Sequence, residues 1–237
     1  MSAPRVREIL RADDPGLGRA HRLLRGVFPR AELLPVREWR YVLAERDARV
    51  WSDLTWHLLI AELDGRTVGA ASGNYLGSLN VGIIGYVAVA PGARARGLGP
   101  RLRRRLAELF DVDARALGGR PLDALVGEVH ATNPWLHHLV RREGAVALDF
   151  DYHQPALGHG TRAVPLVLYH QPVRRRRRAI PAAVVRRLIY ALWRRAYRVP
   201  RPLRSAIFRR MLRDLAGRRL VGQRMLPAPS RARPAVE

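Results

Sequence analysis

The sequence predicts an α/β fold of the α+β kind: a mixed, mostly antiparallel, twisted sheet flanked by helices, followed by a basic two-helix extension. Three observations support this prediction. Two helical patterns open the chain, a run of adjoining apolar strands follows, and strands then alternate with helices. With 237 residues, of which 48% are hydrophobic, the chain is large enough for one sizeable core and an appended segment.

The first half of the chain contains a strong hairpin signal. Two apolar runs within residues 56–75 meet at Asp64-Gly65, a dipeptide typical of tight turns between antiparallel strands. The preceding segments have apolar residues at helical spacing. In chain order we expect a strand at 6–10, helices at 15–27 and 36–46, the hairpin at 56–75, a strand at 83–90, and a helix that ends near 117.

The second half alternates between strand and helix patterns. The segment NPWLHHLVRRE predicts a helix over 133–143, which Gly144 closes. Alternating or continuous apolar residues predict strands on both sides of this helix. The expected strands lie at 123–131, 145–152 and 163–169.

Charge is distributed very unevenly along the chain. All 43 basic residues are arginine, a bias typical of a GC-rich genome. Residues 1–172 contain 23 arginines against 18 acidic residues, whereas residues 173–237 contain 20 arginines against 2 acidic residues. We therefore expect a domain at 1–172, an arginine-rich helical extension at 173–226 and a disordered tail at 227–237.

The extension contains two amphipathic basic helices, expected at 182–199 and 203–216. Their apolar faces need a partner, and three partners are open at this point. The helices fold back on the domain or on a second subunit of a homodimer; or they lie on an anionic membrane, with Trp193, Tyr197 and Phe208 at its interface. The third option is nucleic acid, attracted to the arginines of residues 174–219.

The chain contains no cysteine, which excludes disulfides, thiolate metal ligands and a cysteine nucleophile, and is typical of a reducing compartment. Histidine, aspartate and glutamate form no group at ligand spacing, so we expect no metal site. The start, MSAPRVREIL, has no signal-peptide core, and no later segment approaches the roughly 20 apolar residues of a membrane span. We expect a cytoplasmic location.

The loop at 94–99 has the composition of an anion-binding site, because two arginines and two glycines precede a helix. A Walker A loop is excluded, since the chain contains no lysine. A dinucleotide-binding fingerprint needs a third glycine at the position that Leu102 occupies.

The pattern Arg-x-x-Gly-x-Gly after the strand YVAVAP resembles the acetyl-coenzyme A loop of the GCN5-related N-acetyltransferases (GNAT). The order of elements resembles that family over about residues 5–170, including the helix that begins at Asn133. The resemblance implies a GNAT-like sheet with acetyl-CoA as co-substrate and no metal. The implied cofactor contacts come from Val87, Ala88, Val89, Arg94, Ala95, Arg96, Gly97, Leu98, Gly99 and Asn133.

Physical chemistry supports this assignment of the loop. The diphosphate of coenzyme A would lie over the amides of 95–99, at the positive end of the helix dipole. Arg94 and Arg96 add charge-assisted hydrogen bonds, and Arg96 is a candidate for the ribose phosphate. Pro100 departs from this scheme, since it lacks an N–H and removes one donor.

The catalytic residues match the family less well. Ile83 stands where the family often has a glutamate base, and Val140 where it often has a tyrosine acid. Nearby replacements exist. Glu128 lies in an apolar strand, where desolvation raises a carboxyl pKa toward the range of a base. His130 is predicted on the same strand face, and Tyr152 at the end of the next strand is the candidate acid.

Two functions follow from these observations. The first is an acetyl-CoA-dependent N-acetyltransferase that acts on an amine of a small molecule, amino-acid derivative or peptide, by direct attack in a ternary complex. The alternative is a non-catalytic acyl-CoA-binding module that docks on an acidic partner through its basic helices. Steady thiol release from acetyl-CoA distinguishes the enzyme from the module. No motif identifies the acceptor.

Overall fold

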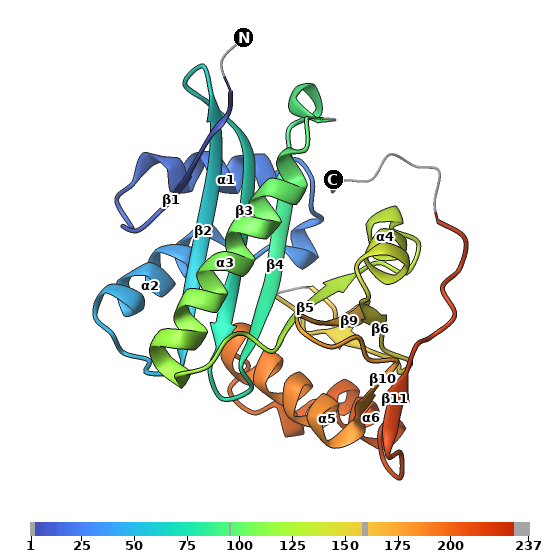
Figure 1. Cartoon of the computed structure of the whole chain (residues 1–237). Helices are drawn as coiled ribbons and strands as arrows, with labels where there is room; N and C mark the ends of the chain where they lie inside the picture. The colour runs from blue at the N-terminus through green and yellow to red at the C-terminus, as the bar shows by residue number, and fades with distance from the viewer. Residues whose placement is uncertain (1–2, 95, 158–160, 230–237) are drawn as a thin grey trace. The chain divides into compact units, whose positions relative to one another are not determined.

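A computed structural model describes residues 3–94, 96–157 and 161–229 (Figure 1). The described chain divides into two compact units, one that extends to Leu125 and one that begins at Val126. The mixed α/β fold class is confirmed. Each unit has its own strands, helices and core.

The first unit contains an antiparallel sheet in the order β1-β2-β3-β4. Its strands are β1 (Arg5–Glu8), β2 (Leu54–Leu63), β3 (Arg66–Leu76) and β4 (Val81–Val89). Its α-helices are α1 (Pro15–Arg25), α2 (Val36–Asp47) and α3 (Leu98–Gly118), with short 3-10 turns at Arg30–Glu32 and Pro91–Ala93. These elements follow the predicted order, and their ends differ from the predicted ones by a few residues.

The sheet of the first unit is covered on both faces (Figure 1). Leu59 and Ala61 of β2 pack in the core beneath α3, whereas Leu58 and Ile60 of the same strand pack with α1 and α2. Successive side chains of a strand point to opposite faces, so a strand covered on both sides is apolar throughout. This explains the continuous apolar run in β2.

The predicted hairpin is confirmed between β2 and β3. Asp64 and Gly65 have φ angles of 48° and 75°, as a two-residue turn of the I′ type requires. At the other edge of β3, Ser72 pairs with Tyr86 and Gly73 with Ile84, so Gly85 of β4 is an extra residue that forms a β-bulge.

The second unit is built from shorter pieces of sheet. Strand β9 (Val167–Pro172) lies between β5 (Ala124–Val129) and β6 (Val146–Ala147). Two further strand pairs join β7 (His153–Gln154) to β8 (Val164–Pro165) and β10 (Ala179–Pro181) to β11 (Leu220–Gly222). The helices are α4 (Pro134–Arg142), α5 (Ala182–Ala191) and α6 (Ala206–Asp214).

Two strand predictions in the second unit were wrong in extent. The predicted strand at 145–152 is regular only over β6, because the backbone then coils through hydrogen bonds from Phe150 N to Leu148 O and from Tyr152 N to Phe150 O. The predicted strand at 163–169 is divided into β8 and β9, and Leu166 N instead donates to Tyr152 O.

The helices of the arginine-rich segment also differ in detail from the prediction. The first ends as an α-helix at Ala191 and continues as a π-helical turn, Leu192–Ala196. The second starts at Ala206, where the Ser205 side chain caps it by accepting a hydrogen bond from Phe208 N. The pair β10–β11 was not predicted.

The apolar faces of these helices are buried within the second unit. Leu188 is 1% exposed, and Leu192, Met211 and Leu215 are completely buried. The chain after α6 joins the same unit, since Arg224 N donates to Ala147 O and Asp149 N to Gly222 O. The fold-back of the helices onto the chain's own surface is therefore observed.

The structure also bears on the membrane option for this segment. Trp193 is 2% exposed and Phe208 is completely buried, so neither ring is available at a membrane interface. Binding of nucleic acid or an anionic membrane by residues 174–219 stays a prediction. Formation of a homodimer also stays a prediction. The domain boundary between residues 172 and 173 stays a prediction from charge. The second compact unit contains residues on both sides of this boundary. Residues 230–237 of the expected tail lie outside the described residues.

Candidate active site

The helix that follows β4 begins at a glycine with a left-handed backbone. Gly97 is the N-cap of α3, with φ 65° and ψ 19°, and no described side chain caps this end of the helix. The Arg101 N–H bonds to Gly97 O, and Pro100 has no N–H. The amides at the start of α3 lack acceptors within the helix, as at any helix N-terminus. This end of α3 is therefore suited to an anion.

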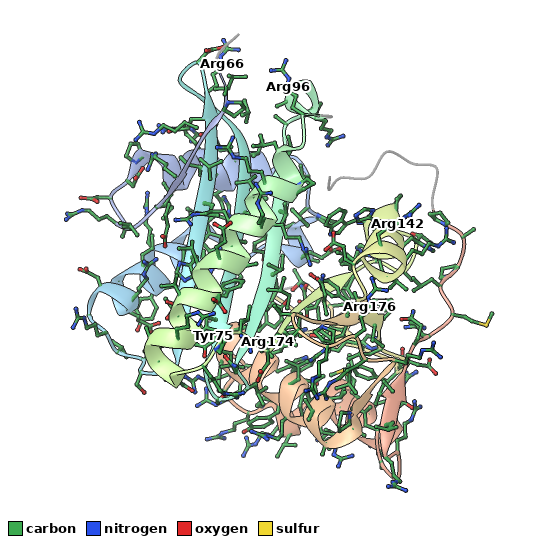
Figure 2. All side chains as sticks on the ribbon, in the orientation of Figure 1. Arg66, Tyr75, Arg96, Arg142, Arg174 and Arg176 are labelled. Atoms are coloured by element: carbon green, nitrogen blue, oxygen red, sulfur yellow. The ribbon has the colours of Figure 1, made fainter. Side chains whose placement is uncertain are left out.

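The two loop arginines have different surroundings. Arg94 Nε donates to Val89 O at 3.2 Å, so this side chain ties the loop back to the end of β4. Arg96 is exposed on the loop (Figure 2). Ala95, which we also predicted to contact the cofactor, lies outside the described residues.

Close packing fixes the start of α3 against the sheet. Leu98 and Leu102 are buried, and a Cβ placed on Gly69 of β3 would lie 3.0 Å from Leu102 Cδ1 and 3.3 Å from Leu98 Cδ2. The apolar stripe of α3 then continues through Phe110 and Ala114, both completely buried, whereas Leu109 is only partly buried. Leu102 is thus a core residue of the helix.

Residues 87–89 form the last part of β4. Val87, Ala88 and Val89 are all buried and pair in antiparallel register with β3. The bulge at Gly85 precedes them by two residues. Bulges are frequent beside active sites, because they redirect a strand and interrupt its pairing.

A carboxylate bound by two phenols forms an ionisable cluster in the second unit. Glu128 of β5 is half-buried. Its Oε1 accepts a hydrogen bond from the Tyr152 hydroxyl, and its Oε2 accepts one from the Tyr197 hydroxyl. The sequence paired Glu128 with Tyr152 as candidate base and acid, and the structure brings these two side chains into contact.

Tyr152 is inaccessible in this cluster. It is 1% exposed, its ring meets Phe150 edge to face, and its backbone N and O are both hydrogen-bonded. Burial raises the pKa of the Tyr152 phenol well above its ordinary value, and the Glu128 carboxylate raises it further. Tyr152 is therefore a neutral hydrogen-bond donor at physiological pH.

Sequence reasoning missed Tyr197 as a site residue, because it follows Glu128 by 69 residues and lies in the arginine-rich segment. The sequence predicts it only as an aromatic residue at a membrane interface. No local pattern identifies it, since its contact with Glu128 depends on how α5 packs.

The other predicted residues of the second unit lie after β5 and at the two ends of α4. His130 follows β5 and is exposed, so the prediction that it extends the strand face was wrong. Asn133 is the N-cap of α4, where its Oδ1 accepts from Trp135 N at 2.9 Å. Gly144 has φ 73° and follows α4, as predicted. The role of Asn133 toward a cofactor stays a prediction.

The first unit contains a separate buried ionisable cluster. His57 Nδ1 lies 2.8 Å from Glu8 Oε1, and His57 Nε2 lies 2.8 Å from Asp113 Oδ2. Arg46 also donates to Glu8 Oε1, at 2.6 Å. Desolvation opposes protonation of His57, but its hydrogen bonds to Asp113 and Glu8 prevail, so its pKa is raised. Asp113 lies about 24 Å along α3 from Gly97 at 1.5 Å per residue, so this cluster is far from the loop.

Within the described residues, no group of three or more His, Asp or Glu side chains is arranged to hold a metal ion. None of the helices in the described part of the chain combines the length and the apolar character needed to cross a membrane.

The fourth strand of the sheet leads through a glycine-bearing loop into a helix of 21 residues. The model of the Acetyltransferase (GNAT) family matches residues 20–144, more than half of the chain. The chain therefore belongs to the GNAT acetyltransferase family. No curated protein sequence matches it.

One solved structure supports the fold, and two others are similar at lower TM-scores. A putative GNAT acetyltransferase from Bacteroides thetaiotaomicron is 20% identical, with a TM-score of 0.59, and the match covers 82% of this chain and 99% of that one. A phosphinothricin acetyltransferase from Sinorhizobium meliloti, in complex with acetyl-CoA, is 14% identical over 72% of this chain and 89% of its own, with a TM-score of 0.49. The ribosomal-protein-S18-alanine N-acetyltransferase from Escherichia coli is 16% identical over 72% of this chain and 94% of its own, with a TM-score of 0.49.

Family membership makes the protein an acetyltransferase. The non-catalytic acyl-CoA-binding module, which the sequence left open as an alternative, finds no support in these matches.

Proposed function

We propose that the protein transfers the acetyl group of acetyl-CoA to an amine of a small molecule, an amino-acid derivative or a peptide, by direct attack in a ternary complex. The observation that carries this proposal is the uncapped, glycine-started N-terminus of α3 beside the exposed Arg96. We assign the diphosphate of coenzyme A to these donors, because a helix N-terminus and a guanidinium group both favour an anion.

The chemistry needs a base, an oxyanion donor and a proton for the leaving sulfur. We assign the base to Glu128, which is half-buried and takes the proton from the amine nitrogen. A backbone amide of Val87–Val89 is assigned to the carbonyl oxygen of the thioester, following the family resemblance. The new C–N bond forms as the C–S bond breaks, and no covalent acyl-enzyme is needed.

Gly97→Glu tests the cofactor site, because it places a carboxylate where the diphosphate is expected. Calorimetry with coenzyme A should show affinity lowered at least a hundredfold. Gly119→Glu is the matched control: Gly119 follows the other end of α3 with φ 63°, and like Gly97 has open space around its Cβ position. Both variants carry the same strain and charge, so equal affinities for coenzyme A would refute the assignment of the loop.

Turnover is tested separately. The wild-type protein should release thiol steadily from acetyl-CoA in the presence of an amine panel of amino acids, diamines and short peptides with free N-termini. Binding of acetyl-CoA without thiol release from any of these amines would contradict the proposed acceptor class. A cytoplasmic location stays a prediction.

A further inference from the structure

Glu128 is held by phenols from two distant parts of the chain. Tyr152 follows it by 24 residues and Tyr197 by 69, and each hydroxyl donates to a different carboxylate oxygen. The Tyr197 hydroxyl oxygen also lies 3.4 Å from Gln154 Oε1. A carboxylate that accepts one hydrogen bond on each oxygen is fixed in orientation and favoured in its charged form.

The two phenols differ in accessibility. Tyr152 is 1% exposed, whereas Tyr197 is only partly buried. A proton donor must reach the atom that it protonates. Tyr152 is enclosed by protein and is suited to orient the carboxylate, whereas Tyr197 is the more exposed phenol and the better candidate for contact with a substrate.

The backbone around Tyr197 is shaped to present this side chain. It follows the π-helical turn Leu192–Ala196, and Tyr197 N donates to Leu192 O, five residues back. One added residue per turn rotates the following side chains by about 100° relative to a continuous α-helix. Arg198 then adopts φ 57°, a left-handed conformation that is uncommon outside glycine. Departures of this kind gather at functional sites.

The π-helical turn before Tyr197 is anchored by Trp193. Trp193 is 2% exposed and its Nε1 donates to His153 O at 3.1 Å, while its ring packs on Phe208 with centroids 5.0 Å apart. The π-helical turn is thus fixed to the chain that directly follows Tyr152. The arginine-rich segment in this way delivers a side chain to the candidate site.

We propose that Tyr197 is the proton donor of the acetyl transfer and that Tyr152 is a positioning residue, which reverses the expectation that Tyr152 is the acid. This inference rests on the proposed function. Glu128 takes a proton from the attacking amine, the C–N bond forms and the C–S bond breaks, and the Tyr197 hydroxyl gives its proton to the departing sulfur. The Tyr197 phenolate then recovers a proton from Glu128 through their shared hydrogen bond. The sum is amine plus thioester to amide plus thiol.

The test compares Tyr197→Phe and Tyr152→Phe in the full-length protein. Tyr190→Phe is the matched control, since Tyr190 is a 42% exposed tyrosine of the neighbouring helix α5. Thiol release from saturating acetyl-CoA with the amine panel gives kcat across pH, calorimetry gives the affinity for acetyl-CoA, and thermal melting checks the fold.

Tyr197→Phe should lower kcat about a hundredfold or more and remove the alkaline limb of the kcat profile, with unchanged affinity for acetyl-CoA. Tyr152→Phe should lower kcat less and keep the alkaline limb, but move the acidic limb to higher pH, because Glu128 loses a donor that favours its charged form. Tyr190→Phe should match the wild type.

Two outcomes would overturn the inference while the proposed function stands. One is a Tyr197→Phe variant within threefold of wild-type kcat with its alkaline limb intact. The other is loss of the alkaline limb in Tyr152→Phe instead. Wild-type protein that binds acetyl-CoA but acetylates no amine of the panel would overturn the proposed function, and the inference with it.

Discussion

The loop after β4 and the Glu128 cluster are both candidate parts of one reaction, but they are built differently. The loop region takes its described groups from the end of β4, residues 87–89, and from the start of α3, residues 97–99, where backbone donors are offered. The Glu128 cluster takes three side chains from positions 128, 152 and 197. In the proposed reaction, binding of the diphosphate therefore depends on local backbone geometry, whereas proton transfer depends on tertiary packing.

The largest effect is expected from removing the arginine-rich segment, which contributes Tyr197 to the Glu128 cluster and no residue to the loop after β4. A chain that ends at residue 172 loses Tyr197 and the apolar faces of α5 and α6, which are buried in the second unit. We expect aggregation or loss of the cooperative melting transition, with no detectable acetyl transfer. Size-exclusion chromatography, thermal melting and thiol release measure these effects.

Removal of residues 227–237 alone is the control for this truncation and should change little. A monomeric, fully active 1–172 protein would show that the arginine-rich segment is an independent docking element.

The next largest effect is expected on kcat when the Glu128 carboxylate is replaced, with no change in coenzyme A binding by the loop. Glu128→Gln keeps the shape of the side chain but cannot accept a proton, so kcat should fall about a hundredfold or more. The affinity for coenzyme A should stay within twofold of wild type by calorimetry. Activity within a few-fold of wild type, with an unmoved pH profile, would transfer the role of base to His130 or to solvent.

A smaller effect is expected from crowding the strand that carries Glu128. A Cβ on Gly127 would lie 2.6 Å from the Tyr169 hydroxyl oxygen and 2.7 Å from its Cε1, and Tyr169 is 2% exposed. Gly127→Ala should therefore cost about 1–3 kcal/mol of unfolding free energy, measured in urea.

Gly85→Ala is the control for Gly127→Ala. Gly85 is an exposed bulge residue, and the nearest atom to a Cβ placed there would be Ser72 O at 3.4 Å, an ordinary van der Waals distance. The loss of unfolding free energy should therefore be much smaller. Equal stability of the two variants would show that β5 and Tyr169 move apart easily.

The smallest effect is a pH dependence confined to the first unit. The pKa of His57 is raised above 6.5, so its stabilising contribution is complete below about pH 6.5 and is lost as pH rises through the folded-state pKa. The pKa of Glu8 is lowered despite desolvation, chiefly through its hydrogen bond to His57, so its contribution is lost as pH falls well below 4.5.

His57→Gln should therefore lose most stability, relative to wild type, between about pH 4.5 and 6.5, with the difference narrowing at higher pH. Urea unfolding across pH measures it. His138→Gln serves as the control, because His138 is half exposed. A His57→Gln deficit that grows above pH 7 would contradict the assigned direction.

The predictions from sequence held best where the signal is local. Asp64-Gly65 forms the predicted turn because positive φ angles at both positions favour these residue types. Gly97 at the N-cap of α3 and Gly144 after α4 also have positive φ angles, which glycine adopts at little cost. The strand expected at 145–152 is regular only over Val146–Ala147, because the backbone then turns through hydrogen bonds at Phe150 and Tyr152. Gln223 of the C-terminal segment pairs with this stretch, since it accepts from Ala147 N and forms a bridge with Leu148.

By itself, the sequence determined the order of elements in the first unit, the glycine that precedes α3 and the position of Glu128 in an apolar strand. These depend on backbone preferences and apolar periodicity, which act over a few residues. Only the tertiary structure decided which phenols bind the Glu128 carboxylate. Tyr197 reaches it because the apolar faces of α5 and α6 are buried in the second unit and a π-helical turn redirects the chain. Burial of apolar surface depends on surfaces that only the folded chain presents, so no spacing in the sequence could reveal that contact.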